Sequence, residues 1–222
     1  PVTVEFSGLP GSGKSYLSGE LARILKREGL RAEEASRALS LLPAPLRLPA
    51  KLARAAAWAI ARPRRAAALW AALAGLNGGL SARLRLFMAS ALPFSWAGRG
   101  LGRVLIVDQG AVQALASAAF QNDPKRLGAL AALLPAPDIL AEIEAGEAAI
   151  AERLAAGRAG GKSRAEDTAG RAAYASALAW ALARPDGPAA RAGLRHKITN
   201  DGSGGGEAAI EPLIRSVHAQ LN

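Results

Sequence analysis

The sequence contains no cysteine and only two histidines among its 222 residues. Without cysteine, the chain has no disulfide framework, no cysteine-ligated zinc and no cysteine nucleophile. The two histidines, His196 and His218, are too few for a histidine-rich metal site. Half of the residues are apolar, so the chain can bury a sizeable core and is not globally disordered. The length fits one α/β domain or two very small ones, and we predict a single domain over residues 1–222.

Acidic residues are missing from a long central part of the chain. Residues 35–107 include 11 lysines and arginines and no aspartate or glutamate, whereas the rest of the sequence is close to neutral. The net charge of +10 therefore comes from this segment, which we expect to face an anion such as a phosphorylated substrate, a nucleic acid or a membrane surface. Nucleic acid is the least favoured of the three, because the charges are spread out and match no known reading motif.

Long hydrophobic runs are also missing. The longest uncharged run, residues 66–82, has 17 residues and contains Asn77, Ser81 and three glycines, so it is shorter and more polar than a membrane span requires. Residues 2–6 alternate like a strand, with no charged and apolar leader before them. We therefore expect no signal peptide and a cytoplasmic protein.

Apolar strands alternate with helices along the chain. The predicted strands are 2–7, 30–35, 103–108, 138–144 and 195–200, and the predicted helices are 13–28, 111–120, 124–134, 147–156, 169–183 and 207–221. Residues 47–92 have a helical pattern punctuated by prolines at positions 43, 45, 49, 63 and 93. This order predicts βαβ units, a mostly parallel sheet and right-handed crossovers.

One glycine-rich motif carries a clear chemical implication. The segment Gly8-Leu9-Pro10-Gly11-Ser12-Gly13-Lys14-Ser15 matches G-x-x-x-x-G-K-[ST] and stands between a predicted strand and a predicted helix, which is the context that supports a phosphate-binding loop. Glycines allow successive backbone N–H groups to converge on phosphate oxygens, and the helix adds its positive end. Lys14 is expected to neutralise the outer phosphates, and Ser15 to offer its hydroxyl to Mg²⁺. The motif thus predicts bound phosphate groups together with Mg²⁺.

A second candidate is Asp108, which ends the apolar strand Val104–Val107. A carboxylate at the C-terminal end of a parallel strand, beside a phosphate loop, can hold a water bound to Mg²⁺. We therefore predict that Ser15 and Asp108 hold the metal and that Lys14 and Asp108 are catalytic. Glu33 and Glu34 end the second strand, where a general base could lie, although surface glutamates are far commoner.

Arginines near residue 155 are candidates for a closing lid. Arg153 and Arg158 are followed or flanked by Gly157, Gly160 and Gly161, and guanidinium groups stabilise the charge that a phosphoryl group spreads over its oxygens in transfer. The alternative is a solvated basic helix end, where arginine meets the helix dipole favourably.

The order of these parts resembles the thymidylate-kinase-like P-loop small-molecule kinases. The likeness rests on residues 6–15, 104–110, 139–154 and 198–203. It implies a three-layer P-loop NTPase fold with a helical cap over residues 37–102, inserted between strands 2 and 3, and a lid over residues 153–168. It also implies that Arg153, Arg158 and Arg164 are lid arginines and that the loop Asn200–Ser203, including Gly202, contacts the adenine.

The chain departs from that family on the acceptor side. Thymidylate kinases carry Asp-Arg followed by an aromatic residue after the third strand, and that arginine helps to hold the acceptor nucleotide; here the residues are Asp108-Gln109-Gly110. Gln113 is a candidate acceptor contact, with a helix-surface glutamine as the alternative. The resemblance therefore supports the ATP side and leaves the acceptor open.

The basic helical segment allows three interpretations. Lys51, Arg54 and Arg62 share one side of a helix, opposite an apolar stripe formed by Leu52, Ala56 and Ile60. The cations could bind an anionic acceptor, or the helix could lie on an anionic membrane with Trp58 and Trp70, or the charges form a solvated face around a small helical core.

Together these patterns predict an ATP-binding kinase that transfers the γ-phosphoryl group of Mg·ATP to a small, anionic acceptor, either a nucleotide or a sugar or other metabolite. The alternative is an ATP-binding switch or slow ATPase that regulates a partner, including at a membrane surface. A second copy of the chain is a further candidate partner.

Overall fold

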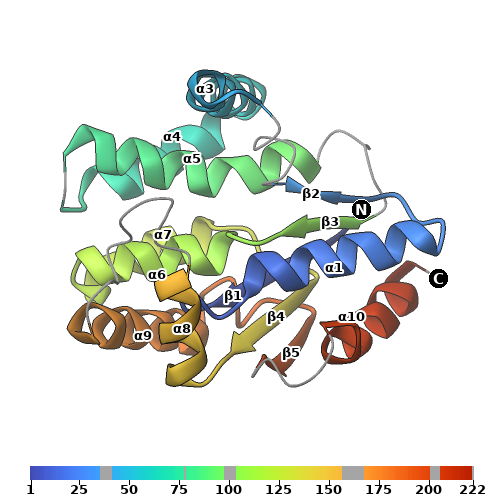
Figure 1. The fold of residues 1–222 in the computed structure, drawn as a ribbon. Coiled ribbons are helices and arrows are strands. Elements are labelled where there is room, and N and C mark those ends of the chain that lie inside the picture. The colour runs from blue at the N-terminus through green and yellow to red at the C-terminus, as the bar shows by residue number, and fades with distance from the viewer. Residues whose placement is uncertain (36–41, 78, 98–103, 157–167, 201–205, 222) are drawn as a thin grey trace.

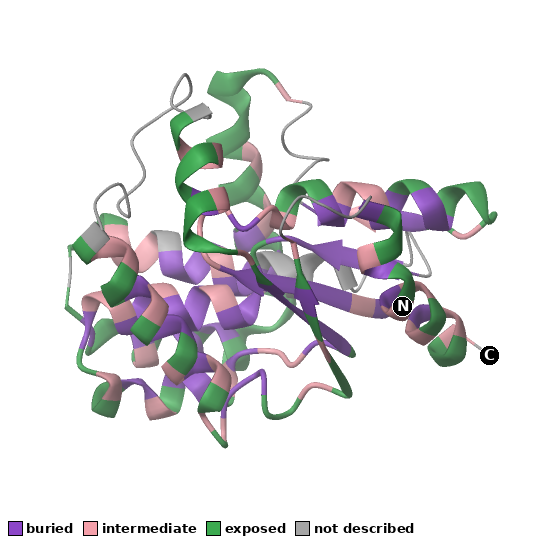
Figure 2. Ribbon diagram, turned by 60° about the horizontal axis from the view of Figure 1, so that its bottom comes forward, coloured by how far each residue is buried: buried purple, intermediate pink, exposed green. Residues whose placement is uncertain are grey.

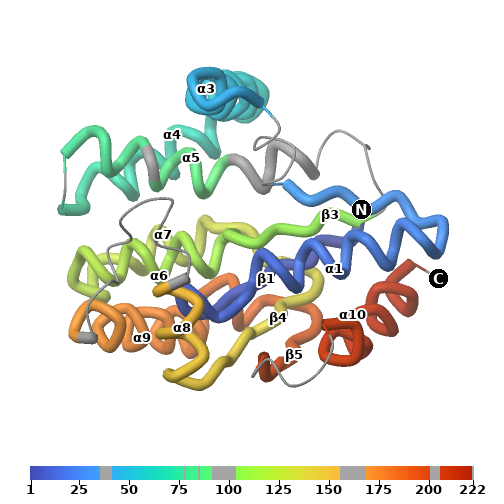
Figure 3. Tube along the Cα trace, viewed as in Figure 1, coloured from blue at the N-terminus to red at the C-terminus, as the bar shows by residue number. Residues whose placement is uncertain are grey.

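The computed structural model describes residues 1–35, 42–77, 79–97, 104–156, 168–200 and 206–221. Its five strands are β1 (Val2–Gly8), β2 (Ala32–Glu34), β3 (Val104–Val107), β4 (Ile139–Glu144) and β5 (Leu194–Thr199). They form one sheet in the order β2-β3-β1-β4-β5, and each neighbouring pair is parallel. The α/β class and the parallel sheet are confirmed. Figure 3 shows β1 between β3 and β4, so the loop that follows β1 leaves from the middle of the sheet.

Helices cover both faces of the sheet, which makes three layers (Figure 1). Helices α1 (Lys14–Arg27) and α10 (Gly206–Leu221) pack on one face, where Phe6, Leu21 and Ile210 belong to a common core. Helices α6 (Ala111–Gln121) and α9 (Thr168–Ala183) pack on the other face, against a second core that reaches Leu140 of β4. The remaining elements of this body are a 3₁₀ turn (Pro124–Leu127), α7 (Gly128–Leu133) and α8 (Glu147–Ala156).

Among the described residues, three helices lie between β2 and β3 in the chain and form the expected cap. They are α3 (Ala44–Ala61), α4 (Pro63–Ala74) and α5 (Leu80–Ala97). Helix α5 contacts both α3 and α6, so it joins the cap to the body (Figure 1). Phe87 of α5 is buried and packs edge-on against Trp58 and Trp70, with ring centroids 6.0 and 5.7 Å apart. These aromatic pairs make the small core that holds the cap helices together.

Prolines interrupt the cap less than their spacing predicts. Helix α3 begins at Ala44 rather than near residue 47, because Pro43 is its N-cap and Pro45 lies in the first turn, where a backbone N–H would have no helical partner. Pro49 lies inside α3, and residue 93 lies within α5. Conversely, the helix predicted from residue 124 begins as a 3₁₀ turn, in which the Asp123 side chain accepts a hydrogen bond from the Lys125 N–H at 3.0 Å.

The buried face of α3 differs from the apolar stripe seen in the sequence. Ala55 and Trp58 are buried, whereas Leu52, Ala56 and Ile60 are exposed. The reason is that α3 packs against α5, where the Trp58 ring meets Phe87. Because Trp58 is buried, the interpretation that placed it on a membrane surface is wrong. The exposed Lys51, Arg62 and Arg64 around the small core of Trp58, Trp70 and Phe87 agree with the interpretation of a solvated face.

Candidate functional site

The phosphate-binding loop predicted from the motif joins β1 to α1. Gly13, the N-cap of α1, has φ 92°, a left-handed conformation that favours glycine. A Cβ atom at this position would also overlap the side-chain nitrogen of Asn200. No side chain caps the first turn of α1, so its backbone N–H groups and positive dipole face the space where an anion would bind. Gly8 to Ser15 therefore lie together at the C-terminal edge of the sheet.

Lys14 lies in the first turn of α1 with its ammonium group over the loop. Its Nζ donates hydrogen bonds of 2.8 Å to the carbonyl oxygens of Gly8 and Leu9. Burial lowers the pKa of Lys14 to about 8, and the nearby carboxylate of Asp108 opposes that shift. Lys14 is therefore an incompletely hydrated cation at the mouth of the loop. Its ammonium group can exchange the two carbonyl oxygens for phosphate oxygens.

The two proposed metal ligands are in contact. Ser15 Oγ donates a hydrogen bond of 3.1 Å to Oδ2 of Asp108, which is buried at the end of β3. Mg²⁺ is usually held by one or two protein oxygens together with phosphate oxygens and waters, and one hydroxyl beside one carboxylate fits that pattern. Across the described ranges, no cluster of three or more acidic or histidine residues offers an alternative metal centre.

Glu34 lies next to this pair at the end of β2. Its neighbour in the sheet, Ile106 of β3, is two residues before Asp108. The Glu34 side chain is half-buried and accepts a hydrogen bond of 3.4 Å from Ser18 of α1. Glu34 is therefore not a surface glutamate. Its position near Asp108 could not be predicted from the sequence, because it depends on the pairing of β2 with β3.

Arg153 and Asn200 meet the outer side of the phosphate loop. Arg153 Nη1 lies 3.5 and 3.3 Å from the carbonyl oxygens of Gly11 and Ser12, and Nη2 donates to the Asn200 carbonyl at 3.1 Å. Asn200 Nδ2 donates to the Ser12 carbonyl at 2.9 Å. The structure thus brings together two residues that are far apart in sequence, one at the start of the predicted lid and one at the end of β5. Arg158, Arg164 and Gly202 lie outside the described residues.

Glu5 is a buried residue of the site that sequence reasoning missed. It lies in β1, and its carboxylate accepts hydrogen bonds from the backbone N–H groups of Ala111 and Val112 at 2.9 and 2.7 Å. These groups begin α6, immediately after the loop that carries Asp108. Gly110 makes this approach available, because a Cβ atom there would overlap the Glu5 carboxyl group. Strand alternation places Glu5 in β1, but only the packing of α6 reveals its partner.

Burial raises the pKa of Glu5 to about 7, although the backbone hydrogen bonds act in the opposite direction. A carboxyl whose pKa rises on folding adds stability below its unfolded pKa, and that stability is lost as the pH rises through the folded pKa. We therefore expect the free energy of unfolding of the wild type, relative to Glu5→Gln, to fall by about 3 kcal/mol between pH 4 and pH 8. Urea unfolding of both proteins across this range measures the difference, and a constant difference would show that Glu5 does not titrate in it.

Gln113 and Tyr174 join α6 to α9 near the same helix terminus. Gln113 Nε2 donates a hydrogen bond to the Tyr174 hydroxyl, and burial raises the pKa of that hydroxyl. Gln113 Oε1 is buried and has no hydrogen-bond partner among the described residues. Gln113 is therefore not a helix-surface glutamine, and its amide oxygen is buried and unpaired within the described part of the chain.

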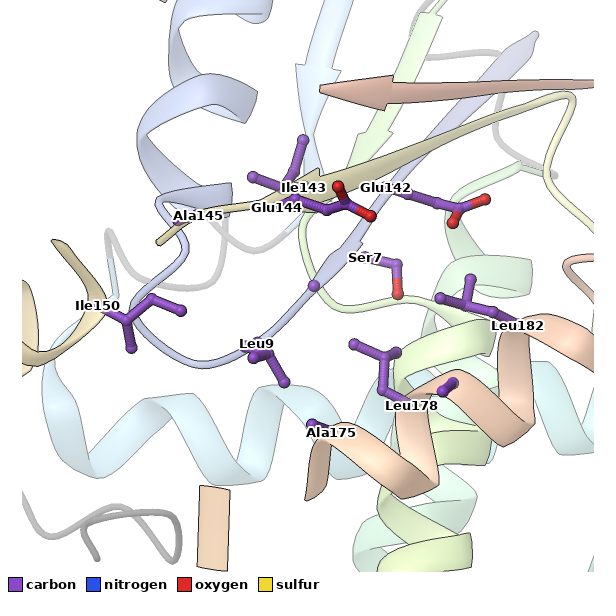
Figure 4. A pocket seen from close by; sticks show the side chains of 12 residues that line it. Ser7, Leu9, Glu142, Ile143, Glu144, Ala145, Ile150, Ala175, Leu178 and Leu182 are labelled. Carbon is purple, nitrogen blue, oxygen red and sulfur yellow. The ribbon is translucent and has the colours of Figure 1, made fainter. Parts of the chain in front are cut away.

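A pocket of about 410 Å³ lies beside the loop, at the C-terminal ends of β1 and β4 and against α9 (Figure 4). Leu178 and Leu182 line one wall, and Ser7 Oγ, buried and without a partner in the described part of the chain, points into the space. Glu142 lines another wall and forms an ion pair of 2.6 Å with Arg195. Apolar walls beside carboxylates suit a neutral group, so this pocket does not itself hold the phosphates.

Comparisons with known proteins agree with this architecture. No protein-family model and no curated protein sequence matches the chain. The structure is similar to a thymidylate kinase from Candida albicans, with a TM-score of 0.54, 14% identity, and 99% of this chain and 92% of that chain covered. It is also similar to a deoxyadenosine kinase from M. mycoides, with a TM-score of 0.53, 11% identity, and 98% and 100% of the two chains covered. The sheet order, the inserted cap and the phosphate loop together show that this chain has the thymidylate-kinase-like P-loop kinase fold.

Proposed function

We propose that the protein is a kinase that transfers the γ-phosphoryl group of Mg·ATP to a small-molecule acceptor. The observation that carries this proposal is the meeting of Lys14, Ser15 and Asp108 at a glycine loop between β1 and α1. A cation, a hydroxyl and a carboxylate at a helix N-terminus are what binding of a magnesium–triphosphate complex requires. The kinase names of the similar structures support the same class.

Each residue has a distinct part in the proposed reaction. The backbone N–H groups of Gly8–Ser15 bind the β- and γ-phosphates, and Lys14 neutralises their outer oxygens. Ser15 and Asp108 hold Mg²⁺, which supplies charge neutralisation at the transferring group. Glu5 positions Asp108 indirectly, by holding the start of α6 through Ala111 and Val112.

The described cations of α3 and α4 contribute little to the phosphate side. Lys51, Arg62 and Arg64 are exposed, and α3 lies on the far side of α5 from α6 (Figure 1). The interpretation in which these cations hold an anionic acceptor therefore lacks support. We propose instead that the acceptor is a small metabolite bound near the start of α6, where Gln113 Oε1 accepts a hydrogen bond from it.

A metabolite screen tests the activity directly. Wild-type protein is incubated with Mg²⁺, γ-³²P-labelled ATP and fractionated pools of nucleosides, nucleotides and sugars. We expect one class of fraction to yield a labelled product that is neither inorganic phosphate nor ATP. Release of labelled phosphate alone, at a rate that changes with a protein partner, would contradict the kinase and support the ATPase-switch alternative.

A further inference from the structure

Among the described residues, the hydroxyl of Ser7 lies unpartnered at the base of the pocket beside the phosphate loop. The strands beneath this pocket, β1 and β4, are buried over nearly their whole length (Figure 2). Ser7 of β1 is 1% exposed, and its side chain points into the pocket (Figure 4). A buried hydroxyl without a hydrogen-bond partner costs free energy. Ser7 Oγ is therefore a place where the polar group of a ligand would be stabilised.

The walls of this pocket are largely apolar. Leu178 and Leu182 of α9 line it together with Ile150 of α8 and two small residues of α9, Ala175 and Ala179. The four α9 residues recur at the spacing of one helix side, and alanine has no side-chain atoms beyond Cβ, so this side stays open. The resulting volume of about 410 Å³ lies within the range of small-molecule sites, about 300 to 1,000 Å³. The pocket is large enough for the body of a small organic molecule.

The charged groups of the pocket disfavour an ionic ligand. Glu142 and Glu144 of β4 line it, whereas no lysine or arginine is among its described lining residues. Both carboxylates are already paired with cations of β5, Glu142 with Arg195 at 2.6 Å and Glu144 with Lys197 at 3.4 Å. An anion would meet two carboxylates and lose its hydration against apolar walls, and a cation would find both carboxylates engaged. The ligand that fits this environment is uncharged.

We propose that this pocket binds an uncharged small molecule that has an apolar body and a hydrogen-bonding group. The body packs against Leu178 and Leu182, and the polar group forms a hydrogen bond with Ser7 Oγ. Neither Lys14 nor Asp108 lines the pocket, so this ligand and Mg·ATP occupy different sites and bind together. The inference is independent of the proposed kinase activity, because binding in the pocket is measured without nucleotide.

Amide-resolved NMR of the ¹⁵N-labelled full chain tests the proposal. The probes are α-naphthylmethanol and α-naphthoate, which share one ring system and carry a neutral hydroxymethyl group and a carboxylate, respectively. We expect the alcohol to shift the backbone amide signals of the pocket residues saturably, with a dissociation constant of about 1 mM or tighter. Naphthoate should bind at least about tenfold more weakly, because its charge is not compensated in the pocket. Mg·ATP should not displace the alcohol.

Two variants locate the bound probe. Ala175→Phe should weaken binding of the alcohol by about tenfold or more, because the added ring occupies the pocket that Ala175 lines. Ala173→Phe is the matched control, since Ala173 is an exposed alanine of the same helix and is not a lining residue; it should bind the alcohol like the wild type. Ser7→Ala should weaken the alcohol by about fivefold without lowering thermal stability, because the hydroxyl that it removes has no partner within the described ranges.

Four results would overturn the proposal. They are the absence of saturable shifts at the pocket residues, equal binding of alcohol and naphthoate, equal loss of binding in Ala175→Phe and Ala173→Phe, and displacement of the alcohol by Mg·ATP. If a variant fails to fold, the comparison of the two probes on the wild type decides the question.

Discussion

Replacement of Lys14 by alanine is expected to reduce ATP turnover by about a thousandfold. Removal of one preorganised hydrogen-bond donor from a transition state lowers kcat by about a hundredfold to a thousandfold, and we expect the upper end because Lys14 is also charged. Lys14 belongs to the loop motif itself, and its Nζ already lies over the carbonyls of Gly8 and Leu9. The fold should survive, because burial of this ammonium disfavours its charged form, as its lowered pKa shows. Steady-state ATP consumption and a thermal unfolding scan measure the two effects.

Lys26→Ala is the matched control, because Lys26 is exposed in the last turn of the same helix; its turnover should equal that of the wild type. The wild type gives a second check through pH. Lys14 has a pKa of about 8 in the free protein, so kcat/KM for ATP should decline above about pH 8 as the ammonium loses its proton. Full turnover by Lys14→Ala would refute the assignment of the phosphate contacts.

The second large effect is expected from Arg153→Ala, which should lower kcat by about a hundredfold and change the ATP dissociation constant by less than about fivefold. The contacts from Nη1 to Gly11 and Ser12 are long, 3.5 and 3.3 Å, and hydrogen bonds of that length are weak. Nη1 can therefore move to a phosphate oxygen while Nη2 keeps its 3.1 Å bond to the Asn200 carbonyl. Such a contact strengthens as charge develops on the transferring group.

The control is Arg215→Ala, an exposed arginine of α10 whose ion pair is with Glu211 of the same helix. It should leave both constants unchanged. Single-turnover rates and calorimetric ATP binding separate the two constants for each variant. If Arg153→Ala weakened ATP binding and left single-turnover chemistry intact, the guanidinium would only brace the loop, and its transition-state role would be excluded.

Much of the fold could be predicted from contiguous residues. Strand β3 is an unbroken apolar stretch, β1 and β4 are short stretches rich in β-branched and other apolar residues, and Gly8–Ser15 is one uninterrupted motif. The helical cap followed from periodicity and from the resemblance. Its helix boundaries did not, because Pro49 lies inside α3, where tertiary packing outweighs the one hydrogen bond that proline removes.

Other features depend on which elements pack together. A period of 3.6 residues shows that α3 is amphipathic but leaves open which arc is buried. The Trp58–Phe87 contact buries the arc of Ala55 and Trp58 and turns Leu52 and Ile60 toward solvent. For the same reason, Gln113 could be judged only once α9 had brought Tyr174 against it.

By itself, the amino-acid sequence determined the alternation of strands and helices and the phosphate loop with Lys14 and Ser15. Both depend on the types and spacing of residues that are neighbours in the chain. Tertiary structure alone decided that Glu5 holds the start of α6, that Arg153 meets Asn200 across the loop, and that α3 turns apolar side chains outward. Each of these joins or orients segments distant in sequence. Their geometry follows from the order of the strands and from the helix faces that fit together.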